Sequence, residues 1–239
     1  MSFYTQTLFR FEVFNRLIFR TGKNLSKPTI LSSQKSDKTY ANETLVYTIA
    51  NSLYINLTDR CTLACEFCPK IQGSMDVHEY NLLLSTRHPV EEYLQKIGDP
   101  AQYDEIVFCG FGEPTLRIKE LLEIAAYCKK AGTRVRVNTD GLGNLVNKRN
   151  ILPELAKCVD ALSVSMNAQN EEVYDQHCVP ALQGSYKSML EFLRLAPQYI
   201  TDTTATAIDG LDGVDIDVCE KQAKNLGVKF RKRVLDIVG

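Results

Sequence analysis

The chain has 239 residues, of which 44% are hydrophobic, and its formal net charge is -1. This length and composition fit one main globular core. The nearly balanced charge argues against a generally basic nucleic-acid-binding surface, and no apolar run approaches the roughly 18–20 residues that span a bilayer. We therefore expect a soluble protein with no membrane anchor and no general affinity for nucleic acid.

The first 44 residues differ from the rest of the chain. Residues 1–45 contain seven Lys or Arg and three Asp or Glu, so this part is basic and the remainder acidic. Apolar residues between 3 and 18 recur at near-helical spacing with arginines among them. Such a start is typical of an organelle transit peptide, but an accessory helix or a leader from an upstream start codon explains it as well. We predict an N-terminal extension and linker over 1–44 and a core domain over 45–239, in the cytoplasm unless the extension is a transit peptide.

Beyond residue 45, short β-branched runs alternate with longer amphipathic runs. The predicted strands, in chain order, cover residues 46–58, 105–112, 133–141, 160–168, 201–209 and 228–234. The predicted helices between them cover residues 90–99, 118–132, 147–159, 185–198 and 215–227. Six strands alternating with five helices make a series of βαβ units, which forms a parallel sheet through right-handed crossovers. Such a sheet either opens into a doubly wound fold or curls toward a barrel.

Unusual polar and glycine-rich segments follow the predicted strands. In chain order they are the cysteine loop 60–70 and the segments 110–116, 138–141, 163–168 and 207–210. Both candidate architectures place ligands at the carboxyl ends of their strands. These segments are therefore predicted to form one site at one end of the sheet.

Three cysteines lie close together, Cys61, Cys65 and Cys68, with no fourth ligand nearby in the sequence. A structural zinc site needs four protein ligands, whereas a 4Fe–4S cluster takes one thiolate per iron and would leave one iron open here. The spacing favours the cluster over zinc, and a redox pair of Cys65 and Cys68 would leave Cys61 without a role. The other five cysteines are scattered, which fits small buried side chains and a reducing compartment. They are Cys109, Cys128, Cys158, Cys178 and Cys219.

The loop after the second strand contains Gly110, Gly112 and Glu113. The glycines would let the backbone approach a ligand closely, and the carboxylate can accept hydrogen bonds from an ammonium group. The same sequence also fits a plain strand-to-helix turn, in which Pro114 opens the helix and the helix dipole favours Glu113.

Later strands end in further polar residues. Asn138 and Asp140 either bind hydroxyl groups or form a turn before Gly141. Ser163 and Ser165 are two residues apart on a strand and so point to the same side. Because burying hydroxyl groups without partners is costly, a ligand contact is plausible for this pair.

Together these motifs resemble the radical S-adenosylmethionine (radical SAM) superfamily. The resemblance rests on CxxxCxxC with Phe67 before the third cysteine, followed by a Gly-Glu-Pro loop after the next strand. Within this superfamily, the segments YDEIVFCGFGEPTLR and VRVNTDGLGNL resemble the sequences of the radical SAM proteins associated with TatD-type nucleases. The resemblance implies an α/β fold, a partial (β/α)6 TIM-like barrel of parallel strands with an N-terminal extension.

The resemblance also implies roles for the motif residues. Cys61, Cys65 and Cys68 would ligate a 4Fe–4S cluster whose open iron binds S-adenosylmethionine, and Phe67 would line the adenine. The remaining implied contacts are Gly110, Gly112 and Glu113 to the methionine ammonium, and Asn138, Ser165 and Ser163 to the carboxylate or ribose. A flavodoxin- or ferredoxin-type donor would reduce the cluster. Cleavage of S-adenosylmethionine would then give a 5'-deoxyadenosyl radical that takes a hydrogen atom from a small molecule or peptide.

Other functions remain open from the sequence. The enzymatic alternative is an activase that forms a glycyl radical on a partner protein, or a relative of the carboxydeazaguanine synthases. The non-enzymatic alternative is a metal-binding partner of a nuclease. The chain departs from many relatives by having Phe111 between the two glycines. His78 and Glu79 are interpreted as solvated loop residues, and His177 as structural. The basic segment 228–234 is interpreted as a solvated edge strand.

Overall fold

The computed structural model describes residues 43–235, so nearly all of the predicted N-terminal extension lies outside the described residues. The start of the core domain at residue 45 stays a prediction. None of the described helices is long and apolar enough to cross a membrane.

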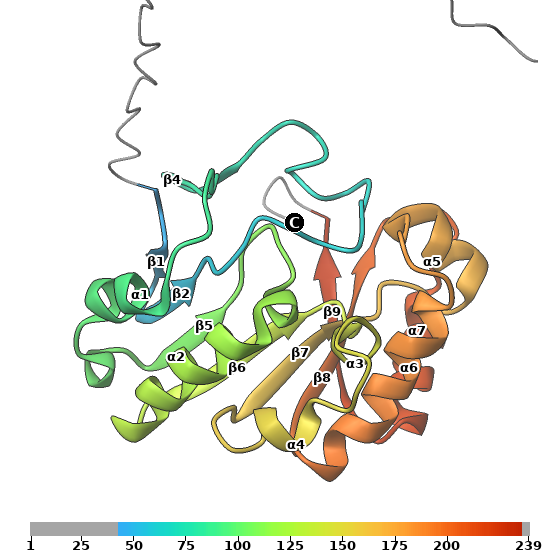
Figure 1. Cartoon of the computed structure of the whole chain (residues 1–239). Coiled ribbons are helices and arrows are strands. Elements are labelled where there is room, and N and C mark those ends of the chain that lie inside the picture. The colour runs from blue at the N-terminus through green and yellow to red at the C-terminus, as the bar shows by residue number, and fades with distance from the viewer. Residues whose placement is uncertain (1–42, 236–239) are drawn as a thin grey trace, which may run out of the picture. The chain divides into compact units, whose positions relative to one another are not determined.

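A sheet of seven strands in the order β1-β2-β5-β6-β7-β8-β9 forms the centre of the fold (Figure 1). The strands are β1 (Val46–Ile49), β2 (Ser52–Ile55), β5 (Glu105–Phe108), β6 (Arg134–Thr139), β7 (Ala161–Ser165), β8 (Asp202–Asp209) and β9 (Lys229–Val234). Neighbours from β2 to β9 pair in parallel, which confirms the predicted α/β fold with six parallel strands. Within the described residues β1 and β9 are not paired with each other, so the barrel is partial.

The first predicted strand is in fact a hairpin. β1 and β2 pair antiparallel, with Ile49 opposite Ser52, so the chain reverses at Ala50 and Asn51. The prediction of one strand over 46–58 was wrong because the turn contains no glycine or proline. Ala50 itself takes the left-handed conformation, with φ of 51°. The hairpin adds an antiparallel edge strand to the parallel sheet.

Four of the five predicted helices are present, namely α1 (Val90–Ile97), α2 (Ile118–Lys130), α6 (Ser185–Leu195) and α7 (Ile216–Asn225). Of the predicted helix over 147–159 only the single turn α4 (Leu152–Leu155) is present, and another single turn, α3 (Gly143–Val146), precedes the predicted range. Lys148 has a positive φ of 53°, and the Asn144 side chain accepts a hydrogen bond from the Ile151 amide at 2.9 Å. A helix cannot continue through this bend.

The other short elements lie in the loops. They are η1 (Pro100–Gln102), η2 (Pro114–Arg117), α5 (Glu171–Cys178), η3 (Ala196–Gln198) and the ribbon β3 (Asp76–Val77) with β4 (Tyr80–Asn81). The ribbon follows the cysteine loop, and α5 follows β7.

The helices cover the outer face of the curled sheet (Figure 1). Leu121, Ile124 and Ala125 of α2 are fully buried, as are Val135 and Val137 of β6. Each fully buried aliphatic side chain of this size contributes about 1.5–3 kcal/mol to folding. Because strand side chains alternate in direction, the residues between these apolar ones point to the inner face of the sheet. The inner face therefore holds the polar side chains.

Candidate functional site

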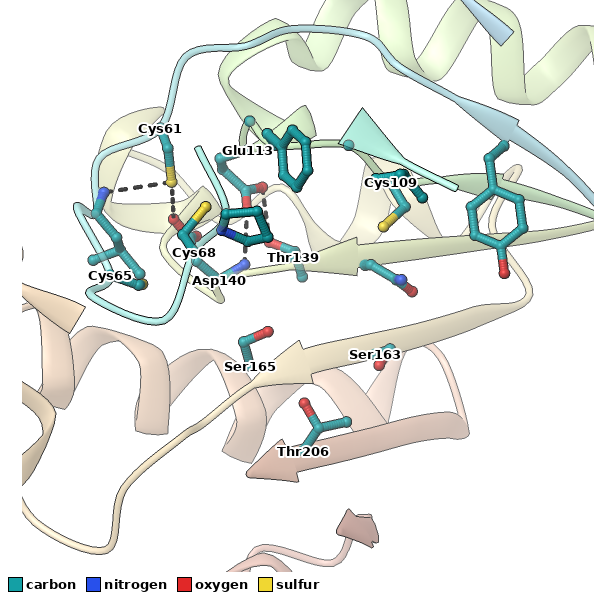
Figure 2. Close-up of a pocket in the computed structure, with 18 of the residues that line it drawn as sticks. Cys61, Cys65, Cys68, Cys109, Glu113, Thr139, Asp140, Ser163, Ser165 and Thr206 are labelled. Carbon is teal, nitrogen blue, oxygen red and sulfur yellow. Dashed lines mark hydrogen bonds between the residues drawn. The ribbon is translucent and has the colours of Figure 1, made fainter. Parts of the chain in front are cut away.

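The inner face of the sheet encloses a cavity of about 380 Å³, a size that suits a small-molecule ligand. Both edge strands line it, β1 through Tyr47 and Ile49 and β9 through Arg231 and Arg233. The cavity therefore spans the gap between the two unpaired edges. All ten predicted site residues line this one cavity: Cys61, Cys65, Phe67, Cys68, Gly110, Gly112, Glu113, Asn138, Ser163 and Ser165. Figure 2 labels the three cysteines, Glu113 and the two serines among them.

The cysteine loop is held in place by the segment after β7. The Ala64 and Glu66 amides donate to the carbonyls of Cys178 and His177 at 3.1 and 3.0 Å. The buried His177 imidazole bonds the Glu66 carboxylate on one side and the Asp212 carbonyl, at 2.6 Å, on the other. His177 thus has the structural surroundings that the sequence analysis expected.

The thiols of this loop face other polar groups of the cavity. Cys61 is exposed as a residue, but its Sγ lies 4.0 Å from Asp140 Oδ2 and accepts a hydrogen bond from the Leu63 amide at 3.4 Å. Burial of the thiol, with the nearby carboxylates of Asp140 and Glu113, raises the pKa of Cys61 to about 12. A hydrogen bond with Cys178, together with burial, raises the pKa of Cys65. Metal binding at these thiols must therefore displace protons.

The donor set of the cysteine loop consists of three thiols that line one cavity, and thiolates are the usual ligands of iron–sulfur clusters. Such a cluster takes one thiolate on each iron. Within residues 43–235, no group of three or more His, Cys, Asp or Glu side chains is already arranged around a metal ion. The fourth thiol of the cavity, Cys109, lies apart from Cys61, Cys65 and Cys68 (Figure 2). The three clustered cysteines therefore fit a cluster with one open iron.

Close packing against neighbouring residues leaves no room for a side chain at either glycine after β5. A Cβ on Gly110 would lie 2.6 Å from Asn56 Oδ1, and one on Gly112 would lie 2.1 Å from the Thr58 carbonyl oxygen. The next residue, Glu113, donates its amide hydrogen to the Arg60 carbonyl at 2.7 Å. Close packing against the start of the cysteine loop is thus sufficient to explain these glycines.

Glu113 is 3% exposed and accepts four hydrogen bonds from its own chain. Oε1 receives the amide and hydroxyl of Thr115, at 2.9 and 2.6 Å, and the Thr139 hydroxyl at 2.8 Å. Oε2 receives only the Asp140 amide, at 2.7 Å. The carboxylate caps η2 and ties the loop after β5 to the end of β6. Its remaining acceptor capacity is on Oε2.

Asp140 joins the end of β6 to the cysteine loop. Its Oδ1 accepts from the Leu142 amide at 2.8 Å, which is the turn that the sequence suggested, and its Oδ2 accepts from the Thr62 hydroxyl at 3.1 Å. Burial, followed by the charge of Glu113, raises the pKa of Asp140 well above its usual range. Two buried carboxyl groups therefore lie beside Cys61.

The middle strands line the cavity with neutral polar groups. Register places Asn138 beside Ser163, and Ser165 beside Thr206. Ser163 and Ser165 both line the cavity, as their spacing predicted. Asn167 has a buried side-chain oxygen that lacks a hydrogen-bond partner among residues 43–235. An unpaired buried acceptor in the cavity lining is what a bound polar ligand would satisfy.

Several cavity residues were missed by the sequence analysis. β9 is an edge strand as predicted, but Arg231 and Arg233 line the cavity, so the description of residues 228–234 as merely solvated was incomplete. Their two-residue spacing was the available signal. Cys109 also lines the cavity, whereas the other four scattered cysteines are buried as expected. His78 and Glu79 are exposed loop residues, as interpreted.

A family model and a curated relative each match part of the chain. Residues 55–223 match the family model of the radical SAM superfamily. Over 88 residues the chain is 40% identical to Fe-coproporphyrin III synthase of Methanosarcina barkeri, an alignment that covers 36% of this chain and 20% of the relative. The chain thus spans about a fifth of the length of that curated relative.

Solved structures share the fold at low sequence identity. SuiB of Streptococcus suis bound to S-adenosylmethionine is 12% identical, with a TM-score of 0.59 over 79% of this chain and 41% of that chain. A radical SAM methyltransferase from Sphaerobacter thermophilus is 14% identical, with a TM-score of 0.52 over 79% and 68%. The family model covers well over half of the sequence, and the protein therefore belongs to the radical SAM superfamily, whose enzymes use a 4Fe–4S cluster and S-adenosylmethionine.

Proposed function

We propose that this protein takes a hydrogen atom from a small molecule or peptide bound in the cavity of the partial barrel. The observation that carries the proposal is that the cysteine loop, the loop after β5 and the polar ends of β6 and β7 line one cavity. When bound, the reduced cluster and S-adenosylmethionine supply a 5'-deoxyadenosyl radical. The protein itself binds and orients both partners and excludes water.

Cys61, Cys65 and Cys68 would hold the cluster, and Phe67 would line the adenine. The loop of Gly110, Gly112 and Glu113 would contact the methionine ammonium, chiefly through backbone groups and Glu113 Oε2. Asn138, Ser163 and Ser165 would bind the carboxylate or the ribose hydroxyls. The Ser165 hydroxyl has no hydrogen-bond partner among the described residues, which supports a role in ligand binding.

Asp140 would act as a positioning residue. Its two carboxylate oxygens bond Leu142 and Thr62, so the end of β6 and the cysteine loop keep a fixed separation. Glu113 extends this connection to the loop after β5. Hydrogen-bonded connections of this kind hold reacting groups at one distance.

The reductant would be a flavodoxin- or ferredoxin-type donor. All eight cysteines are free thiols, which supports a reducing compartment such as the cytoplasm. The similar proteins differ in kind: one is Fe-coproporphyrin III synthase, and SuiB has been solved bound to its precursor peptide SuiA. The link to a TatD-type nuclease stays a prediction from the sequence motifs.

Anaerobic reconstitution with iron and sulfide tests the proposal. We expect about four iron atoms per chain and, after reduction with S-adenosylmethionine, release of 5'-deoxyadenosine detected by mass spectrometry. Cys65→Ala should abolish both. Cys109→Ala, which removes a cavity thiol outside the trio, is the matched control and should retain the cluster.

Two results would contradict the proposal. One equivalent of zinc without iron in anaerobically purified protein would favour the non-enzymatic metal-binding function. Release of 5'-deoxyadenosine only in the presence of a partner protein would favour an activase.

A further inference from the structure

The charged residues of the cavity are separated by sign. The acidic pair Glu113 and Asp140 lies at the side where the three cysteines gather (Figure 2). Arginines line the cavity from β6 and β9 instead, at Arg136, Arg231 and Arg233. Along β6, Arg136 is four residues before Asp140, which corresponds to about 13 Å of extended strand. Arg136 therefore lies away from the acidic pair along β6, and together the three arginines make one side of the cavity lining cationic.

Arg231 is the arginine most available to a ligand. Its guanidinium donates to the Ser163 hydroxyl at 3.3 Å, and no carboxylate within residues 43–235 forms an ion pair with it. The lysines of the same strand do have such partners, since Lys229 pairs with Asp202 at 2.9 Å and Lys232 with Asp209 at 3.0 Å. A cavity-lining guanidinium without a counter-ion is suited to a carboxylate or phosphate.

Arg136 adds positive charge to the cavity lining, and hydrogen bonds hold its guanidinium in place. Its Nε donates to Glu105 at 2.9 Å and one terminal nitrogen donates to Asn138 at 2.6 Å. Glu105 is shared with Arg134, at 3.1 Å, and Arg134 also pairs with Asp202, which Lys229 shares, so three cations share two carboxylates here. The local charge balance at this side is therefore positive.

An aromatic and aliphatic wall belongs to the same cavity. Tyr47 and Ile49 of β1 and Tyr54 of β2 line it. The Tyr47 and Tyr54 rings stack with their centroids 5.1 Å apart, and the Tyr47 hydroxyl is already bonded to the Cys109 carbonyl at 3.1 Å. This wall therefore offers mainly apolar ring surface, which favours an aromatic or apolar ligand body.

We propose that the substrate is a small molecule with a carboxylate or phosphate group held by Arg231, beside Arg136, and an apolar or aromatic body against Tyr54 and Ile49. This inference rests on the proposed function and gives its substrate class.

Calorimetric titration of the full chain, purified anaerobically, with phenyl phosphate tests the proposal. This probe carries a dianion and an aromatic ring. Loss of one charge-assisted pair in a cavity weakens binding about tenfold or more. We expect that loss for Arg231→Gln and a smaller loss for Arg231→Lys, which keeps the charge but not the planar fork. Lys232→Gln is the matched control, because Lys232 neighbours Arg231 on β9 but does not line the cavity, and it should change the affinity less than twofold.

The outcomes that overturn the proposal are distinct. They are absence of phenyl phosphate binding, equal weakening by Lys232→Gln, or an Arg231→Gln variant that binds as well as the unmodified chain. Inorganic phosphate or benzyl alcohol binding as tightly as phenyl phosphate would also overturn it, since both halves of the probe are required.

A second experiment distinguishes a failure of this proposal from a failure of the proposed function. In cluster-loaded protein, S-adenosylmethionine should leave the affinity for phenyl phosphate within about twofold. Displacement of the probe would mean that the arginines hold the carboxylate of the cofactor, which overturns the substrate assignment. Failure to load a cluster counts against the proposed function, whereas the titration of the unloaded chain still decides the anion site.

Discussion

Asp140 Oδ2 lies 4.0 Å from Cys61 Sγ and accepts a hydrogen bond from the neighbouring Thr62 hydroxyl at 3.1 Å. A buried carboxyl group at the end of a central strand thus contacts the loop that carries all three clustered cysteines. The position of that loop depends on the sheet and not on the loop sequence alone.

Replacing Asp140 should therefore loosen this connection. Asp140→Ala removes the bonds to Leu142 and Thr62, and we expect a loss of about 1–3 kcal/mol in the free energy of unfolding, measured by urea denaturation. Asp140→Asn retains an oxygen acceptor and should lose less. Equal losses for the two variants would show that the hydrogen bonds do not contribute.

Gly112 cannot accept a side chain, because a Cβ there would lie 2.1 Å from a backbone oxygen. Gly112→Ala should destabilise the protein by more than about 3 kcal/mol, since the strain cannot be relieved by a side-chain rotation. Gly132→Ala is the comparison: Gly132 has a φ of +83° but nothing within 4 Å of its would-be Cβ. That variant should cost only about 1–2 kcal/mol, and similar melting temperatures for the two would contradict the packing argument.

Removing the His177 imidazole should weaken cluster retention. His177→Ala deletes the bonds to Glu66 and the Asp212 carbonyl, which position the middle of the cysteine loop. We expect less iron per chain after gel filtration of the reconstituted variant than of the unmodified protein. His78→Ala, at an exposed position, is the control and should keep its iron. Unchanged iron content in His177→Ala would show that the backbone bonds alone hold the loop.

The stability of the protein should depend on pH through His88. Burial opposes its charged form, but hydrogen bonds to Glu43 and Glu92 outweigh this effect and raise the pKa of His88. The resulting stabilisation is fully present below the unfolded pKa of about 6.5. It is lost as the pH rises through the higher folded pKa. Urea midpoints measured between about pH 6 and 9 should fall less steeply for His88→Gln than for the unmodified chain.

His177 has a pKa raised in the same direction, so the unmodified profile contains both contributions. The difference between the unmodified protein and His88→Gln isolates His88. Parallel profiles for these two proteins would contradict the assignment.

Much of the fold could be predicted because its signals are local. The apolar alternation of β6 and the glycine after α2 predicted these two elements correctly. The spacing of Cys61, Cys65 and Cys68 pointed to a loop that does line the cavity, and their role as cluster ligands stays a prediction. The loops that meet in the cavity were predicted to meet because parallel strands place their carboxyl ends together.

The missed features depend on contacts between distant residues. Glu113 accepts a hydrogen bond from Thr139, which is 26 residues away, and no local pattern indicates that bond. The orientation of Arg231 toward the cavity depends on how far the sheet curls at its edge. The reversal uses Ala50, a residue that rarely takes a positive φ, so Asn51 is the turn's one local signal.

The close approach of Gly112 to the Thr58 carbonyl and the bond from the Glu113 amide to the Arg60 carbonyl join the loop after β5 to the residues just before the three cysteines. Among the described residues, no ladder of hydrogen bonds joins β1 to β9. Spreading those two edge strands would therefore break no ladder of the sheet, whereas separating the two loops would break the bond between Glu113 and Arg60.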